Sequence, residues 1–116
     1  MEARLSAQTL APEPARLMLG FEKYISGCGL EPSLIELVKV RASQINGCAF
    51  CLDMHTQDAR AAGETERRLY ALSAWRETPF FTERERAALA WAEAVTLISG
   101  GAPDAVYEEA RRQFSE

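Results

Sequence analysis

The 116-residue sequence contains no apolar run near the ~20 residues that a membrane-spanning helix needs. Its N-terminus, Met-Glu-Ala-Arg-Leu, has no basic head followed by an apolar stretch, so we predict no signal peptide. The formal net charge is -4, so basic residues are not in excess. This balance argues against an electrostatic nucleic-acid interface. We therefore expect a cytoplasmic protein whose partners include neither nucleic acid nor membrane.

Cysteine and histidine are also scarce, with three cysteines and one histidine in the chain. An odd number of cysteines argues against the disulfide framework of a small secreted domain. Three of these four residues, Cys48, Cys51 and His55, nevertheless lie within eight consecutive positions. In a reducing compartment such a Cys-x-x-Cys pair is more typical of catalysis or metal binding than of a structural disulfide. The third cysteine, Cys28, lies apart from them, and we interpret it as a buried structural thiol.

Signals for β-strands are almost absent. Apolar residues recur at helical spacing between the glycine and proline residues that interrupt the chain. The sequence therefore predicts one all-α domain over residues 1–116, a helical bundle of about six helices. We expect these helices over residues 13–27, 31–46, 48–62, 65–74, 82–99 and 103–114.

On the helix expected after Gly47, the side chains of Cys48, Cys51 and His55 fall within about 60° on one face. The two sulfur atoms are then within reach of a disulfide. The first turn of a helix stabilises an anion, which lowers the pKa of a thiol there and favours Cys48 as the thiolate. The imidazole of His55 can accept the thiol proton and return it to a leaving group.

Glu36 precedes Cys48 by twelve residues on the preceding predicted helix. If the chain reverses at Asn46-Gly47, the carboxylate can face Cys48 and His55 and orient the imidazole. The alternative is a capping box with Ser33, in which Glu36 only closes the start of its own helix. The residues alone leave both interpretations open.

Metal binding is a second interpretation of the same residues. Cys48, Cys51 and His55 can hold zinc, with Glu36 or water as the fourth ligand. Structural zinc sites usually draw a second ligand pair from elsewhere in the chain, and this sequence has none. A non-catalytic redox-sensing or zinc-binding module is therefore the alternative to an enzyme that binds no metal or other cofactor.

The complete pattern is a glutamate, eleven residues, Cys-x-x-Cys, three residues and a histidine, here Glu36, Cys48, Cys51 and His55. With this pattern the stretch from about residue 30 to 96 resembles the alkylhydroperoxidase AhpD-like core domain of the carboxymuconolactone decarboxylase superfamily. Residues 40–48 and 55–60 share the resemblance. Phe50 stands where some members of the family have a second histidine.

The resemblance implies an all-helical subunit of a homo-oligomer, a trimer or a hexamer. It implies a thiol-dependent peroxidase or disulfide reductase that takes a hydroperoxide and is regenerated by a protein dithiol or another reductant. In the family the second cysteine becomes the sulfenic acid, which assigns the attack to Cys51 and the resolving role to Cys48. Glu36 and His55 then form the proton relay. For the attacking sulfur we follow the family, although helix electrostatics favours Cys48.

Overall fold

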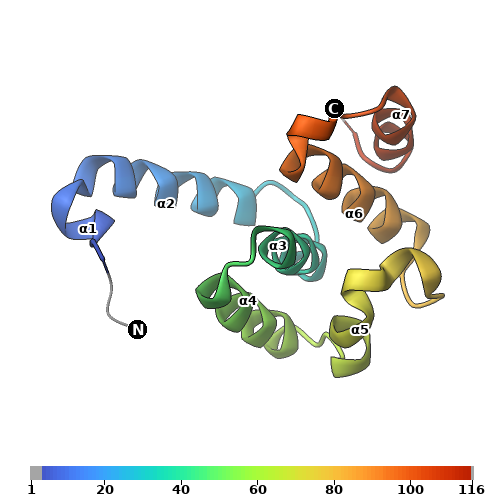
Figure 1. The fold of residues 1–116 in the computed structure, drawn as a ribbon, viewed down its shortest axis with the longest axis horizontal. Coiled ribbons are helices and arrows are strands. Elements are labelled where there is room, and N and C mark those ends of the chain that lie inside the picture. The colour runs from blue at the N-terminus through green and yellow to red at the C-terminus, as the bar shows by residue number, and fades with distance from the viewer. Residues whose placement is uncertain (1–3, 116) are drawn as a thin grey trace. The chain divides into compact units, whose positions relative to one another are not determined.

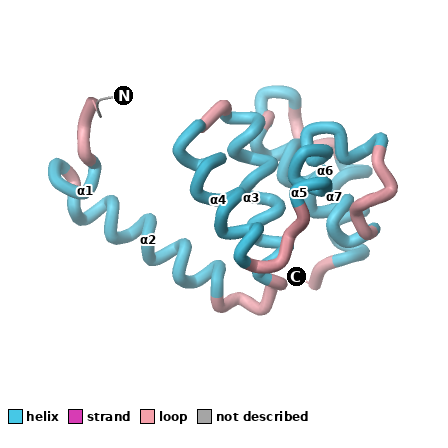
Figure 2. Tube along the Cα trace, turned by 90° about the horizontal axis from the view of Figure 1, so that it is seen from below, coloured by secondary structure: helices cyan, strands magenta, loops and turns pink. Residues whose placement is uncertain are grey.

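The computed structural model describes residues 4–115, which form helices joined by loops, with no strand among them (Figures 1 and 2). The all-α prediction is therefore confirmed. The elements are α1 (Ala7–Leu10), α2 (Pro12–Ser26), α3 (Pro32–Asn46), α4 (Ala49–Ala61), α5 (Glu66–Ala71), the 3₁₀ helix η1 (Leu72–Glu77), α6 (Glu83–Thr96), the 3₁₀ helix η2 (Ile98–Gly100) and α7 (Asp104–Gln113). Within the described range, no helix is both long and apolar enough to cross a bilayer.

Two local features differ from the helices expected from the sequence. The short helix α1 was not predicted; Ser6 caps it, and Ala11 leaves the helical region because Pro12 follows. The helix predicted over residues 65–74 is α5 followed by η1, since Ala74 has non-helical dihedral angles of φ -117° and ψ 30°. The other predicted helices agree with the structure to within three residues at each end.

Backbone contacts divide the chain into two compact units, one ending at Glu31 and the other beginning at Pro32. The first unit contains α1 and α2. Several large apolar side chains of α2 are exposed to between 62% and 74%: Leu17, Met18, Leu19, Phe21 and Tyr24. The second unit contains α3 to α7 and all the candidate site residues predicted from the sequence.

Helix α3 is the central element of the second unit, where it packs against both α4 and α6, while α7 packs against α6. The most deeply buried large side chains come from α3, η1 and α6: Leu37, Val40, Leu72 and Leu89, each at most 1% exposed. Burial of each such side chain stabilises the fold by about 1.5–3 kcal/mol. This core holds α3 in place against α4, the helix at whose N-terminus the cysteines lie.

The reversal between α3 and α4 depends on Gly47, whose φ of 63° lies in the left-handed region that glycine adopts without steric cost. The amide of Cys48 donates to the carbonyl of Ser43 at 3.2 Å, and the amide of Gly47 donates to Gln44 at 3.3 Å. These two bonds complete the last turn of α3 in a Schellman arrangement. The next residue, Cys48, is then the N-cap of α4.

Glu93 on α6 connects three elements of the second unit. Its carboxylate accepts hydrogen bonds from Arg41 of α3 at 2.7 Å, from the Trp75 ring nitrogen at 2.8 Å, and from Arg76. Burial raises the pKa of this carboxyl, but the hydrogen bonds from Arg76, Trp75 and Arg41 outweigh burial and hold the pKa below its usual value of 4.5. The ionised group therefore stabilises the folded state.

Replacement of this residue by Glu93→Gln should lower the free energy of unfolding near neutral pH by about 1–3 kcal/mol. The pKa of Glu93 is lower in the folded than in the unfolded chain. Its contribution is therefore present above about pH 4.5 and is lost as the pH falls through the folded value. Denaturant unfolding over a pH series should thus show a smaller acid-induced loss of stability in the variant. The control is Glu66→Gln, because Glu66 is exposed; equal pH slopes for Glu93→Gln and wild type would contradict the assignment.

Candidate active site

The two cysteines lie at the N-terminus of α4 and form a disulfide, with their Cα atoms 5.3 Å apart. This separation is normal for a disulfide, and it confirms that the spacing brings the two sulfurs together. The helix begins one residue later than predicted: Cys48 is the N-cap, and its Sγ accepts a hydrogen bond from the amide of Cys51 at 3.3 Å. Both cysteine residues are partly exposed to solvent.

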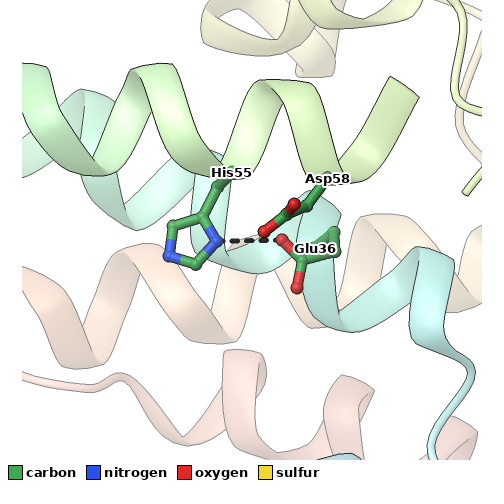
Figure 3. Close-up of side chains that lie close together, drawn as sticks. All are labelled: Glu36, His55 and Asp58. Carbon is green, nitrogen blue, oxygen red and sulfur yellow. Dashed lines mark hydrogen bonds and ion pairs between the residues drawn. The ribbon is translucent and has the colours of Figure 1, made fainter. Parts of the chain in front are cut away.

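His55 lies one turn after Cys51 on α4, and its Nδ1 is 2.9 Å from Oε2 of Glu36 on α3 (Figure 3). The side chains of His55 and Glu36 are only 15% and 17% exposed. The other carboxylate oxygen of Glu36 lies 3.9 Å from Nζ of Lys39. Both oxygens thus have side-chain partners, which favours the imidazole-orienting role of Glu36 over the capping role.

The contact with Glu36 determines which ring nitrogen of His55 is available for chemistry. An ionised carboxylate only accepts hydrogen bonds, so Nδ1 carries the hydrogen that it donates to Glu36. The second ring nitrogen, Nε2, is turned away from Glu36 (Figure 3). This leaves Nε2 to exchange a proton with another group.

A third side chain lies beside this pair. Asp58 follows His55 by three residues on α4, and one of its carboxylate oxygens lies within 4.8 Å of both a Glu36 oxygen and a His55 nitrogen. Figure 3 shows the carboxylate directed toward the pair. Asp58 was not among the site residues predicted from the sequence. The signal that could have found it is the i, i+3 spacing from His55, which places both side chains on one helix face.

The zinc set considered from the sequence is not available in this state. Cys48 and Cys51 are bonded to each other, whereas zinc binds the thiolate form of cysteine. Within the described part of the chain, the group of three metal-ligating side chains at close range is Glu36, His55 and Asp58, which offers nitrogen and oxygen donors. The two sulfur atoms therefore lie apart from this group, and the carboxylates of Glu36 and Asp58 surround the imidazole.

Two further residues considered in the sequence, Phe50 and Cys28, are exposed to solvent. The side chain of Phe50, between the two cysteines, is 75% exposed. Cys28 is exposed, so its interpretation as a buried structural thiol was wrong. It lies in the loop after α2, between Gly27 and Gly29, and such connecting segments run along the surface.

A sequence model of the Carboxymuconolactone decarboxylase family matches residues 12–94, which is more than half of the chain. The uncharacterized protein YdfG of Bacillus subtilis (strain 168) is 46% identical over 117 residues, covering 100% of this chain and 80% of YdfG. The uncharacterized protein YnjA of Escherichia coli (strain K12) is 32% identical over 77 residues, covering 66% of this chain and 42% of YnjA.

Similarity extends to a solved structure. A protein of unknown function from Agrobacterium tumefaciens, a candidate antioxidant defence protein AhpD, matches with a TM-score of 0.93 and 44% identity. The match covers 99% of this chain and 80% of the other. The family resemblance found in the sequence is thus confirmed by the family model and by the solved structure. The chain belongs to the carboxymuconolactone decarboxylase family and has its AhpD-like helical fold.

Proposed function

We propose that this protein is a thiol-dependent peroxidase or disulfide reductase that cycles Cys48 and Cys51 between dithiol and disulfide without a cofactor. The observation that carries the proposal is the Cys48–Cys51 disulfide at a helix N-terminus, on the same helix as an imidazole bound to Glu36. A dithiol of this kind supplies two electrons, and the imidazole supplies the proton that a peroxide leaving group needs.

In the oxidative half of the cycle, His55 takes the proton of the Cys51 thiol, and the thiolate attacks one oxygen of a hydroperoxide. The O–O bond breaks, the sulfur loses two electrons, and the other oxygen leaves as an alcohol after His55 returns the proton. Cys51 is now a sulfenic acid. The Cys48 thiol attacks this sulfur, a disulfide forms and water leaves. Glu36 holds the imidazole in the tautomer that these transfers require.

In the reductive half, an external dithiol supplies the two electrons. One of its thiolates attacks the Cys51 sulfur, the bond to Cys48 breaks, and a mixed disulfide forms. The second donor thiolate then attacks the donor sulfur that is bonded to Cys51. This releases the thiolate of Cys51, and the donor leaves as a disulfide. The N-cap position stabilises Cys48 as the departing thiolate, since its Sγ accepts the amide hydrogen of Cys51.

The N-cap geometry therefore supports a division of roles between the two sulfurs. The family resemblance assigns the peroxide attack to Cys51, whereas helix electrostatics favours the thiolate of Cys48. Both are accommodated if Cys51 is the sulfur that exchanges with substrate and reductant and Cys48 is the stabilised leaving group. A protein dithiol is the reductant that suits this exchange, because the pair is partly exposed.

We further propose that the subunits assemble into a homo-oligomer, a trimer or a hexamer. The support is the exposed apolar side chains of α2, since an apolar surface of this kind is typical of protein–protein contacts. The side chain of Phe21, for example, is 67% exposed.

Replacement of either cysteine of the pair should reduce dithiol-dependent peroxide consumption to the uncatalysed rate. Cys51→Ser removes the attacking sulfur, and Cys48→Ser leaves the sulfenic acid of Cys51 unresolved, which mass spectrometry of the oxidised variant should detect. Cys28→Ser is the matched control, because this exposed thiol lies outside the pair, and it should consume peroxide like wild type. If both pair variants retain the wild-type rate, the proposed function is wrong.

The variant Glu36→Gln should lower kcat/KM for the hydroperoxide by about a hundredfold, because the neutral amide no longer stabilises a protonated imidazole. Thermal unfolding followed by circular dichroism should show that the fold is retained. Glu66→Gln is the control, since its carboxylate pairs with Arg60 at 3.7 Å on the surface. Unchanged kcat/KM in Glu36→Gln would remove Glu36 from the relay.

Replacement of an apolar residue on α2 by a charge should weaken the oligomer. Phe21→Glu is expected to shift the mass measured by light scattering toward that of a single chain, because a buried carboxylate at a contact is costly. Tyr70→Glu is the control, as Tyr70 is an aromatic residue of α5 that is 77% exposed. A wild-type protein that has the mass of one chain would refute the assembly.

A further inference from the structure

The proposed cycle gives no role to Asp58, although this carboxylate is placed beside the relay. The carboxylate oxygens of Glu36 and Asp58 and a nitrogen of His55 lie within 4.8 Å of one another. The interaction drawn between these side chains in Figure 3 joins His55 to Glu36. Two groups at up to 4.8 Å are within the span of one bridging water, which hydrogen-bonds to both.

The three side chains differ in their access to solvent. Those of His55 and Glu36 are 15% and 17% exposed, so the protein shields most of their surface. Asp58 is exposed, and it is therefore the member of the cluster that meets bulk water. Carboxylates exchange protons readily with water and with dissolved buffers. The cluster thus extends from a shielded imidazole to a solvent-facing carboxylate.

Proton balance shows which half of the cycle needs this route. During peroxide reduction, the proton taken from Cys51 returns to the leaving alcohol within the site. During disulfide reduction, the attacking donor thiolates have already released their protons to solvent. The S–S bond breaks with two electrons from the donor, and Cys48 and Cys51 must take up two protons to become thiols again. Those protons come from water.

We infer that Asp58 is a positioning residue that carries protons from solvent to the Glu36–His55 pair during reduction of the Cys48–Cys51 disulfide. The inference rests on the proposed function. Asp58 accepts a proton from water or buffer and passes it, directly or through one water, to Glu36 and His55. Nε2 of His55 then delivers it to the sulfur released by the reductant. Lys39, near the second oxygen of Glu36, keeps that carboxylate close to a positive charge during transfer.

The test separates the two half-reactions of the full-length protein in a weakly buffered solution. Reduction of the disulfide by a dithiol and single-turnover oxidation of the reduced protein by a hydroperoxide are each followed by stopped flow. Asp58→Asn should slow the reductive step by about tenfold and leave the oxidative step unchanged. Added imidazole buffer should restore the reductive rate of the variant, because a dissolved acid replaces the missing carboxylate.

Two further variants complete the experiment. Asp58→Glu keeps a carboxylate at this position and should retain most of the reductive rate. Asp53→Asn is the matched control, as Asp53 is another exposed carboxylate on α4 that accepts a hydrogen bond from Gln57 at 2.9 Å. This control should reduce and oxidise like wild type in weak buffer.

Several results would overturn the inference. If the Asp58→Asn variant is reduced as fast as wild type in weak buffer, the proton route is excluded. A slow variant that imidazole does not restore shows a structural effect. One divalent metal ion per chain in wild type, absent from Asp58→Asn, would assign the cluster to a cation instead. Failure of the proposed function is distinct, because wild type itself would then show no dithiol-dependent peroxide turnover.

Discussion

The chain reversal at Gly47 is the constraint on which the rest of the site depends. A positive φ at this residue ends α3 and makes Cys48 the N-cap of α4 in a single step. The same reversal brings α4 against α3, so that a glutamate and a histidine nineteen positions apart form a hydrogen bond. An L-residue with a side chain at this position would meet steric strain in the left-handed region. One backbone conformation therefore determines the capping of a sulfur and the orientation of an imidazole.

The core and the charged network around Glu93 hold the helix that the site uses. Helix α3 contributes Leu37 and Val40 to the core, Arg41 to the carboxylate of Glu93 and Glu36 to the imidazole. Its inner face therefore contributes to the core, and its face toward α4 carries the carboxylate that is hydrogen-bonded to His55. Because packed interiors deform little, the position of the Glu36 carboxylate follows from packing on the other side of the same helix.

In the cycle that we propose, the helix N-terminus and the Glu36–His55 relay act on different sulfurs. The amide of Cys51 donates to the Cys48 sulfur, while the relay begins at His55, one turn after Cys51. Electrostatic stabilisation of an anion at the N-cap suits a sulfur that must leave. Proton exchange suits a sulfur that must attack and later be protonated. The roles that we propose, with Cys48 as the leaving group and Cys51 as the attacking sulfur, follow from this difference between the two ends of one helical turn.

The sequence by itself determined the helical class, the break between two helices at Asn46-Gly47 and the shared face of Cys48, Cys51 and His55. These features follow from the spacing of apolar residues and from the backbone freedom of glycine, which depend only on residues close together in the sequence. It left the role of Glu36 open between helix capping and orientation of His55, because either is compatible with the spacing. It also placed Cys28 in a core that does not cover it and left Asp58 out of the site. Only the packing of α3 against α4 brings the carboxylates of Glu36 and Asp58 to His55, since contacts between helices depend on distances that no local pattern contains. Cys28 is exposed for a different reason, because it lies in the loop after α2.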